Sequence, residues 1–481
     1  MPDSQYDCIV IGSGPGGYVS AIRAAQLGMR TAVIEDDKVG GRCLNYACIP
    51  AKAVLRVADV LSEVREAGDF GIKVAAPEVD YEAVKARREK VVATLTSGVA
   101  SLLAKHEIEL IEGRGAPAGG GRVTVAGRTR TGERVADDRG LTAKTIVLAT
   151  GSIAKPIPGT RLQGRVIGTE EAWALEELPQ SMAVVGAGAS GVEIASAYAR
   201  LGVEVRLLEA LERVLPAEDA DISKLVERGL GRQGITLHTS TLVENVEATR
   251  SGVNFTYRQR SRGSSAPRSD DSSATGEAQW LVIAAGRSAD VGALGLDAAG
   301  VRLGEDGLIE VDGAMRTSAG GVYAIGDLVP GPALAHKASD EGVIAVEDAA
   351  GMKTHPIAYI DVPRATFCTP NVASFGLTEA QARAQGHDVV VGKVPYGALG
   401  AGTVYGDRTG LVKIVGEQRY GELLGGHIVG MRATELIQEL VNVRASEGGY
   451  PELARMIHAH PTLSEVVLEA ARGADGWLVH G

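Results

Sequence analysis

Residues 6–17 read Y-D-C-I-V-I-G-S-G-P-G-G, and they decide the fold of this chain. The run Tyr6–Ile11 is apolar and typical of a buried strand. It ends in a G-x-G-x-x-G pattern made by Gly12, Gly14 and Gly17. In this pattern the first glycine permits a tight turn, the second lets a pyrophosphate approach the backbone, and the third lets helix and strand pack closely. Because free N–H groups at the start of the next helix favour negative charge, the stretch predicts a dinucleotide site.

The same arrangement occurs twice in the chain. After the first pattern, a helical stretch runs to about Gly28, and a strand over 31–34 ends in Glu35, which would accept hydrogen bonds from a ribose. The second copy has a strand over 183–185, an acid at Glu209, and glycines at Gly186, Gly188 and Gly191. The first glycine and the acid are 23 positions apart in both copies. Two complete copies predict two dinucleotide sites, and the alternative is a pair of glycine-rich turns without ligands.

Three further apolar runs, over 145–149, 280–285 and 322–325, are predicted to be strands. They end in Thr150-Gly151, Gly286-Arg287 and Gly326-Asp327. Strands that end in this way suit the carboxyl edge of a parallel sheet, where ligands bind. We therefore expect Asp327 to hold a cofactor hydroxyl, and the alternative is an aspartate that only forms a turn.

Length and charge restrict the class of protein. The chain has 481 residues, which predicts about three domains. Its net charge is -11 and it has no dense run of Lys or Arg, so a nucleic-acid partner is not expected. No apolar run reaches the roughly 20 residues that span a bilayer, and the first apolar run reads as a strand, not as a signal peptide. We predict a cytoplasmic protein without a membrane partner.

The predicted fold class is α/β, with two Rossmann-like dinucleotide-binding domains and a C-terminal α+β domain. The two nucleotide domains are expected over 1–150 and 151–280, with 281–350 completing the first and 351–481 forming the last. From about Gly351, strand-like and helical runs alternate without a nucleotide fingerprint. The stretch Arg260–Ala278 has almost no apolar content, so we predict a long, mobile polar loop at a hairpin tip.

Two cysteines lie shortly after the first fingerprint, in residues 40–52, which read G-G-R-C-L-N-Y-A-C-I-P-A-K. Cys43 and Cys48 are predicted to be catalytic, because no second Cys or His pair nearby would complete a metal site. A purely structural disulfide is the alternative. Pro50 suits the first turn of a helix, which places Cys48 near the positive end of that helix and favours a thiolate. Lys52 adds positive charge one turn later.

A histidine near the end of the chain is the candidate acid/base. His460 precedes a proline and then a helical pattern, and Glu465 in the first turn of that helix is expected to reach back to the imidazole. His458 has no such partner in the sequence and is interpreted as scaffold. Glu193 follows the second fingerprint and is expected to pair with Lys52. The alternative for Glu193 is an acid that only stabilises the helix dipole.

The cysteine segment resembles the active-site signature of flavoprotein disulfide reductases, which usually reads G-G-T-C-L-N-x-G-C-I-P-S-K. The segments H-A-H-P-T-L-S-E and G-D-L-V-P-G-P-A-L-A-H-K-A are similar to the branch of that family that oxidises a dihydrolipoyl group. The resemblance extends from Tyr6 to about Glu465, nearly the whole chain.

The resemblance implies a role for each matching position. Cys43 would exchange with the dithiol substrate, and Cys48 would contact the flavin. His460, held by Glu465, would serve the neighbouring subunit, so a homodimer is implied. The residues implied for FAD are the first fingerprint with Glu35, Lys52, Gly115, Thr150, Gly151, Asp327, Leu334, Ala335 and His336. The residues implied for the nicotinamide are the second fingerprint with Glu193, Glu209 and Gly286, and the acid at Glu209 favours NAD because it would repel a 2′-phosphate.

Some positions depart from the family signature. Arg42 replaces a small residue, and Ala47 replaces glycine. Ala47 is tolerable at negative φ, whereas positive φ would cost roughly 1–2 kcal/mol.

The predicted partner is a lipoyl-bearing protein of a 2-oxoacid dehydrogenase or glycine-cleavage complex. The remaining alternatives are a glutathione- or mercuric-type reductase and a non-catalytic, cofactor-bound scaffold subunit.

Overall fold

The computed structural model describes residues 5–127, 132, 134, 138–260, 273–292 and 294–481. The chain divides into two compact units, and each gathers separate parts of the sequence. The first unit contains Met1–Ala53, Ala83–Lys155 and Arg287–Tyr359. The second contains Val54–Glu82, Pro156–Gly286 and Ile360–Gly481. Among the helices of the described residues, none combines the length and the apolarity needed to cross a bilayer.

The first unit is built on a seven-stranded sheet with the order β3-β2-β1-β6-β5-β4, in which β17 also pairs with β6. The strands β3, β2, β1, β6 and β17 run parallel, and β5 and β4 extend the sheet antiparallel. The strands are β1 (Tyr6–Ile11), β2 (Thr31–Glu35), β3 (Glu109–Glu112), β4 (Arg114–Pro117), β5 (Arg122–Ala126), β6 (Arg139–Leu148) and β17 (Val322–Ala324). A separate ribbon pairs β7 (Ser152–Ala154) with β16 (Arg287–Ala289).

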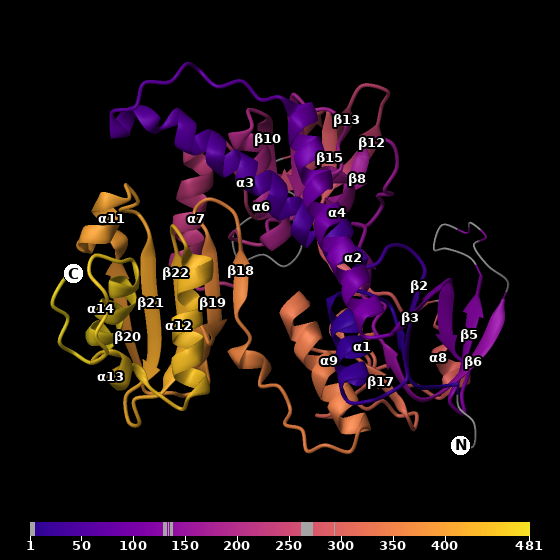
Figure 1. Cartoon of the computed structure of the whole chain (residues 1–481). Helices are drawn as coiled ribbons and strands as arrows, with labels where there is room; N and C mark the ends of the chain where they lie inside the picture. The colour runs from indigo at the N-terminus through magenta and orange to yellow at the C-terminus, as the bar shows by residue number, and fades with distance from the viewer. Residues whose placement is uncertain (1–4, 128–131, 133, 135–137, 261–272, 293) are drawn as a thin grey trace. The chain divides into compact units, whose positions relative to one another are not determined.

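Two helices of the first unit cross at very short range. Helices α1 (Pro15–Gln26) and α9 (Ala335–Ala349) lie side by side (Figure 1). A Cβ on Gly342 would lie 2.2 Å from Ser20 Oγ, so this crossing requires glycine. The other helices that lie in or begin in this unit are α2 (Gly41–Asn45), α3 (Cys48–Arg65), α8 (Leu296–Ala299) and the 3₁₀ turns Gly326–Leu328 and Tyr359–Asp361. Helix α4 (Tyr81–Lys105) ends in it.

The second unit contains a five-stranded parallel sheet with the order β11-β10-β9-β15-β8. Its strands are β8 (Val166–Gly168), β9 (Ser181–Val185), β10 (Glu204–Leu208), β11 (Thr236–His238) and β15 (Trp280–Ile283). The helices that accompany them are α5 (Thr169–Trp173), α6 (Ala189–Arg200) and α7 (Ala220–Arg232), and a 3₁₀ turn covers Ala67–Phe70. Both predicted βαβ units are therefore present, each on its own parallel sheet.

The structure predicted for the polar stretch Arg260–Ala278 was only partly correct. A three-stranded antiparallel sheet joins β12 (Thr241–Ala248), β13 (Val253–Gln259) and β14 (Ser273–Ala278), so the hairpin is confirmed. The expectation of a loop up to Ala278 was wrong, because Ser273–Ala278 pairs along Val253–Arg258. Backbone pairing with β13 outweighs the weak strand propensity of these small polar residues. Residues 261–272 lie outside the described residues.

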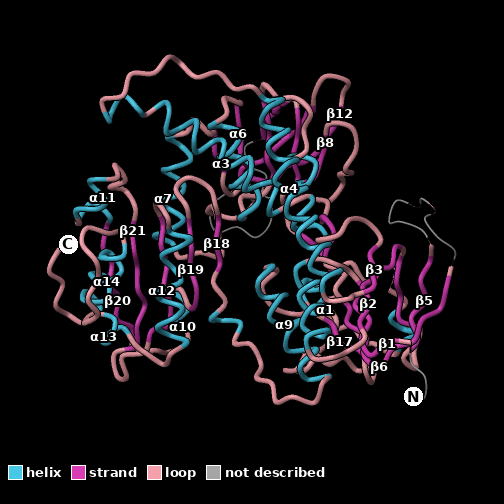
Figure 2. The backbone as a smooth tube through the Cα atoms, in the orientation of Figure 1, coloured by secondary structure: helices cyan, strands magenta, loops and turns pink. Residues whose placement is uncertain are grey.

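The C-terminal part of the second unit is a five-stranded antiparallel sheet with the order β18-β19-β22-β21-β20. The strands are β18 (Arg364–Thr366), β19 (Val372–Gly376), β20 (Val389–Pro395), β21 (Leu411–Glu417) and β22 (Leu423–Val429). The helices are α10 (Glu379–Ala384), α11 (Gly400–Val404), α12 (Ala433–Ala445), α13 (Tyr450–Leu453) and α14 (Ser464–Ala474), with a 3₁₀ turn at Tyr396–Ala398. Figure 2 shows α12 along β19, and α12 also packs on β22. The core of this part includes Phe375, Ile428 and Leu440.

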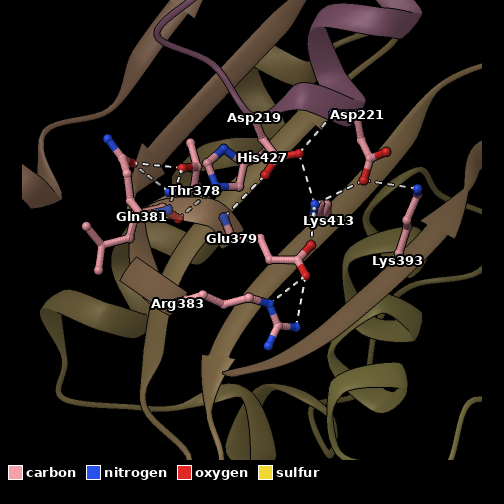
Figure 3. Close-up of polar contacts among 10 residues, drawn as sticks. Asp219, Asp221, Thr378, Glu379, Gln381, Arg383, Lys393, Lys413 and His427 are labelled. Atoms are coloured by element: carbon pink, nitrogen blue, oxygen red, sulfur yellow. Dashed lines mark hydrogen bonds and ion pairs between the residues drawn. The ribbon is translucent and has the colours of Figure 1, made fainter. Parts of the chain in front are cut away.

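Helix α7 and this C-terminal sheet share a buried cluster of charges, drawn in Figure 3. Lys413 of β21 lies 2.9 Å from Asp219, 3.0 Å from Asp221 and 2.8 Å from Glu379. The side chains of Lys413 and Asp219 are both almost fully buried.

The predicted fold class, two nucleotide-type parallel sheets and a C-terminal α+β part, is confirmed. The bounds of the four predicted segments stay predictions.

Candidate functional site

The two glycine-rich turns have nearly the same geometry. Gly12 has φ +102, and a Cβ there would lie 2.4 Å from Ala149 O. Gly186 has φ +104, and a Cβ there would lie 2.6 Å from Ala284 O. A Cβ on Gly17 or Gly191 would lie 1.9 Å from the carbonyl oxygen of Gly12 or Gly186, respectively. These four positions therefore require glycine for the reasons that the sequence pattern predicted.

The middle glycine of each turn faces open space. Apart from chain neighbours, no described residue has a heavy atom within 4 Å of a Cβ built on Gly14 or Gly188. Each of these glycines is the N-cap of its helix, and neither helix has a side-chain cap. The N–H groups of the first turn of α1 and α6 are thus accessible to an anion, and both turns fit a pyrophosphate.

Each acid predicted at the end of the second strand of a βαβ unit holds its own turn. Glu35 accepts hydrogen bonds from Ser13 N at 2.8 Å and Asp37 N at 3.0 Å. Glu209 accepts from Ala187 N at 2.6 Å and Leu211 N at 2.8 Å. Burial raises the pKa of Glu35, although Ser13 and Asp37 donate to its carboxylate. The carboxylates are therefore fixed in the turns next to which a ribose would bind.

Asp327 is held by residues that the sequence analysis did not select. Ser152 Oγ donates a short hydrogen bond to the Asp327 carboxylate. Arg287 Nε donates to Ser152 Oγ at 2.8 Å, and Arg287 also donates to the Ser152 carbonyl. Thr150 Oγ1 donates to Asp290 O at 3.1 Å, and Asp290 N donates to Gly151 O at 3.0 Å. The ends of β6, β7 and β16 are thus joined beside Asp327.

A second group of residues, which the sequence analysis did not select, fixes the backbone of Gly326, the residue before Asp327. Glu341 accepts from Gly326 N at 2.7 Å, and Lys337 Nζ donates to Gly326 O at 2.8 Å. Lys337 and Glu341 are fully buried and lie 3.0 Å apart, and Tyr359 donates to Glu341 at 2.5 Å. Gly326 has φ +71, so both polar groups of a left-handed residue are fixed. The i,i+4 spacing of a lysine and a glutamate on an amphipathic helix was the available signal.

The other predicted cofactor residues lie on the first parallel sheet, on α9 and after β15. Gly115 belongs to β4, and a Cβ there would lie 3.1 Å from the side chains of Ile11 and Ile34. Leu334 is the N-cap of α9, and Ala335 and His336 are its first residues. Gly286 follows β15 with φ +116. Their role as cofactor contacts stays a prediction.

The cysteine segment begins directly against the first glycine-rich turn. Gly40 N donates to Ser13 Oγ at 3.1 Å, and a Cβ on Gly41 would lie 2.7 Å from Gly14 Cα. Cys43 lies in α2, and Cys48 is the first residue of α3, as the proline pattern predicted. The open question about Ala47 is settled, because its φ is not positive and the methyl group adds no backbone strain.

The side chains of the two cysteines are in contact through a hydrogen bond. A hydrogen bond to Cys48, together with burial, raises the pKa of the Cys43 thiol well above its usual value, although Lys52 and Arg42 oppose the shift. Cys43 therefore keeps its proton, while Cys48 lies at the positive end of α3. A reaction at Cys43 requires a base from elsewhere.

The predicted acid/base pair is formed in the second unit. His460 Nδ1 lies 3.0 Å from Glu465 Oε1, and Glu465 Oε2 accepts from Thr462 N at 2.8 Å. The expectation that His458 has no carboxylate partner was wrong, since its Nε2 contacts Glu439 Oε1. Glu439 lies on α12, so sequence spacing could not indicate this contact. Glu193 is buried and accepts from Phe367 N at 2.9 Å, and its pairing with Lys52 stays a prediction.

Comparisons with known proteins cover almost the whole chain. A family model described as pyridine nucleotide-disulphide oxidoreductase matches residues 6–342, and the dimerisation domain of the same oxidoreductases matches residues 362–471. The chain is 42% identical to a dihydrolipoyl dehydrogenase of Chlorobaculum tepidum, over 97% of both chains. It is 38% identical to a dihydrolipoyl dehydrogenase of Bacillus subtilis, over 99% of both chains.

Solved structures agree with this result. The crystal structure of LpdA from Mycobacterium tuberculosis has a TM-score of 0.86 and 28% sequence identity, over 97% of this chain and 99% of that one. The HOCl-induced flavoprotein disulfide reductase RclA from Escherichia coli has a TM-score of 0.82 and 26% identity, over 98% of this chain and 100% of that one.

Proposed function

Because this chain belongs to the pyridine nucleotide-disulphide oxidoreductase family, we propose that it catalyses the reaction of a dihydrolipoyl dehydrogenase. It oxidises a dihydrolipoyl dithiol and delivers the electrons to NAD. The observation that carries the proposal is the pair of thiols in contact at the start of α3, directly beside a turn that fits a pyrophosphate. The relatives favour this reaction over a glutathione- or mercuric-type reductase and over a scaffold subunit.

The sulfur chemistry follows from the roles of the two cysteines. In the oxidised enzyme, Cys43 and Cys48 form a disulfide, and one thiolate of the substrate attacks Cys43 and releases Cys48 as a thiolate. The second substrate thiolate then attacks the first, which forms the lipoyl disulfide and releases Cys43. The released Cys43 takes up a proton, in agreement with its raised pKa, and Cys48 keeps the negative charge near the positive end of α3.

His460 supplies the proton transfers of this sequence. Its Nδ1 faces Glu465, so that Nε2 is free to take a proton from the substrate thiol and return one to Cys43. Cys43 and Cys48 belong to the first unit, and His460 and Glu465 belong to the second. The matched dimerisation domain supports a homodimer, and we propose that the pair acts on the cysteines of the partner subunit.

The cofactors of the reaction are FAD and NAD. FAD, when bound, supplies the two-electron chemistry between the thiol pair and the nicotinamide. We propose that the first turn, Glu35 and Asp327 hold FAD, with Lys52, Gly115, Thr150, Gly151, Leu334, Ala335 and His336. The second turn, with Glu193, Glu209 and Gly286, holds NAD. The open space at Gly14 and Gly188 supports both assignments.

The finer biological assignments are also proposals. We expect the dithiol substrate to be a lipoyl group on a protein of a 2-oxoacid dehydrogenase or glycine-cleavage complex, and we expect the enzyme to work in the cytoplasm. The domains proposed are 1–150 for FAD, 151–280 for NAD, 281–350 as the segment that completes the FAD domain, and 351–481 for dimerisation.

Purified holoprotein tests the reaction directly. It should show flavin absorbance and reduce NAD when dihydrolipoamide is added, and half-reduction should produce a long-wavelength band from the Cys48 thiolate beside the flavin. Glutathione disulfide and Hg(II), supplied with NADH or NADPH, should be poor substrates. A colourless protein, or a preference for either of those two substrates, would rule out the proposal.

Glu209 is expected to make the enzyme prefer NAD over NADP. Its carboxylate would repel a 2′-phosphate, so kcat/KM with NAD should exceed that with NADP by roughly a hundredfold. The variant Glu209→Gln should lower the ratio of kcat/KM with NAD to kcat/KM with NADP about tenfold, which corresponds to about 1.4 kcal/mol. Glutamine leaves one backbone N–H of the turn unpaired, so the ratio and not the rate is the measurement.

The control is Glu204→Gln, at the exposed other end of β10, which should leave the ratio unchanged. An equal use of both nucleotides by the unmodified enzyme would contradict this assignment of Glu209.

A further inference from the structure

The two peptide groups on either side of Gly326 are each held by a buried charged side chain. Glu341 Oε2 accepts from Gly326 N at 2.7 Å, and Lys337 Nζ donates to Gly326 O at 2.8 Å. Because the soft rotations of the backbone are φ and ψ, holding both peptide planes fixes the conformation of Gly326. Glycine otherwise has the largest conformational freedom of any residue, and this one has φ +71.

The remaining contacts of the two charged side chains lie within the same cluster. Lys337 Nζ lies 3.0 Å from Glu341 Oε1 and 5.4 Å from the centre of the Tyr359 ring. Tyr359 OH donates to Glu341 Oε1 at 2.5 Å. A Cβ on Gly331 would lie 3.1 Å from Lys337 Cε and 3.2 Å from the Tyr359 ring, so the loop before α9 packs directly on the pair. The ammonium thus has three partners for its three N–H donors.

Stability alone is a weak reason for this ion pair. Both side chains are fully buried, and the cost of removing two charges from water offsets most of their attraction. Apolar side chains of similar volume would fill the same space, but they could not bind Gly326 N and Gly326 O. The pair is therefore best explained by the residue that the fixed glycine positions, which is Asp327.

Asp327 is the residue through which the fixed glycine acts. It follows Gly326 in the 3₁₀ turn Gly326–Leu328, so the ψ angle of Gly326 sets the direction in which the chain reaches it. Ser152 Oγ donates to one carboxylate oxygen, Asp327 Oδ2, so Oδ1 is the oxygen that would accept a cofactor hydroxyl. The backbone before Asp327 and its side chain are thus held by two different groups of residues.

We propose that the buried Lys337–Glu341 pair, together with Tyr359, positions the FAD site. The pair fixes Gly326 and thereby holds the Asp327 carboxylate where it binds a hydroxyl of the cofactor. The three side chains act through Asp327 and not by their own contact with FAD. The proposal rests on the proposed assignment of Asp327 to FAD, but it does not depend on which dithiol the enzyme oxidises.

Binding of FAD to the flavin-free protein tests this role without turnover. Glu341→Gln removes the charge and one acceptor oxygen, so the hold on Gly326 weakens and the Kd for FAD should rise about tenfold. Asp327→Ala removes the proposed acceptor itself and should raise the Kd by roughly 10–100-fold. The measurement is titration of the apoprotein with FAD, followed by the change in flavin fluorescence.

The double variant Asp327→Ala/Glu341→Gln separates positioning from a general structural role. If Glu341 acts through Asp327, the double variant should bind FAD as Asp327→Ala does, within about twofold. If the pair only stabilises the fold, the two losses should multiply, and the double variant should bind FAD about tenfold more weakly than Asp327→Ala.

Two further variants probe the other members of the cluster. Lys337→Met should give the same pattern as Glu341→Gln in this cycle. Tyr359→Phe keeps the ring and loses one hydrogen bond, so it should fold and weaken FAD binding about threefold. If Lys337→Met does not fold, Tyr359→Phe and Glu341→Gln still decide the result.

The matched control is Glu347→Gln, on the same helix. Glu347 lies later in α9, and its Oε1 accepts from Arg23 Nε of α1 at 2.8 Å. This variant also removes a glutamate from an ion pair of α9, but the Kd for FAD should change by less than about twofold.

Unchanged FAD binding in Glu341→Gln and Tyr359→Phe, or losses that multiply in the double variant, would overturn the positioning role. Unchanged FAD binding in Asp327→Ala would overturn it as well, and would remove Asp327 from the proposed cofactor site. A failure of the proposed reaction has a different signature, a protein that binds FAD but does not reduce NAD with dihydrolipoamide. In that case the binding cycle would still decide the role of the pair.

Discussion

Replacing Cys43 by serine should lower dihydrolipoamide-dependent NADH formation by roughly 10⁴-fold, the scale seen when a nucleophile that acts within a catalytic unit is removed. Serine cannot form the disulfide, and its hydroxyl cannot be the sulfur that the substrate attacks. FAD content should not change, because Cys43 lies in α2 and the glycine-rich turn holds its own geometry. The measurement is steady-state turnover together with the flavin absorbance of the purified variant.

The matched control for that experiment is Cys368→Ser. Cys368 is a buried thiol with its Sγ 3.1 Å from Pro370 O, outside the cysteine segment, so turnover should be retained in the folded fraction. A Cys43→Ser enzyme that turns over at the rate of the unmodified one would refute the sulfur exchange. A Cys368→Ser enzyme that is folded and yellow but has no turnover would show that the loss of activity is not specific to the cysteine segment.

Replacing Lys413 by methionine should lower the free energy of unfolding by about 3–5 kcal/mol, the cost of removing one partner from a buried ion pair. Figure 3 shows the ammonium of Lys413 among the carboxylates of Asp219, Asp221 and Glu379. The variant leaves Asp219 as a buried charge without its cation. The measurement is chemical denaturation near neutral pH.

The control is Lys393→Met, which removes an ion pair of the same cluster at the surface. Lys393 lies 3.0 Å from Asp221, but its side chain is 46% exposed, so the loss should be about 0–1 kcal/mol. Equal losses in the free energy of unfolding for the two variants would contradict the expectation that the buried lysine contributes more to stability than the exposed one.

Acidification should reduce the difference between Lys413→Met and the unmodified protein. Donation from Lys413 lowers the pKa of Glu379. Burial is the largest effect at Asp219 and Asp221 and raises their pKa, but donation from Lys413 and the neighbouring hydrogen bonds and charges together outweigh it, so both pKa values are lowered. Carboxyl groups with a lowered pKa stabilise the fold above their unfolded values and lose this effect as the pH falls through the folded values. The difference should therefore shrink below about pH 4.

Local sequence determined most of what could be predicted. The requirement for glycine at Gly17 comes from the carbonyl oxygen of Gly12 in the same turn, so a short pattern contains it. The contact of His460 with Glu465 also lies within one turn and the helix that follows it. The fold class and the family, which these patterns predicted, are confirmed.

Contacts between distant segments were not predictable. Glu439 and His458 lie in different elements, and no sequence pattern around either residue indicates a contact with the other. Ser152 and Arg287 are joined by a two-stranded ribbon that spans a long separation in sequence. Strand β14 was missed for a related reason, since its place in the sheet depends on its partner strand and not on its own composition.

The two glycine-rich turns are tied in the same way to the acid of their βαβ unit. In both, the carboxylate accepts from the N–H of the residue that follows the first glycine. The copies diverge at that very residue. Ser13 in the first copy uses its hydroxyl to join Glu35 to Gly40, at the start of the cysteine segment, whereas Ala187 in the second copy has no hydroxyl. The Ser13 hydroxyl thus ties the start of the cysteine segment to the first turn, a link that the alanine of the second turn cannot make.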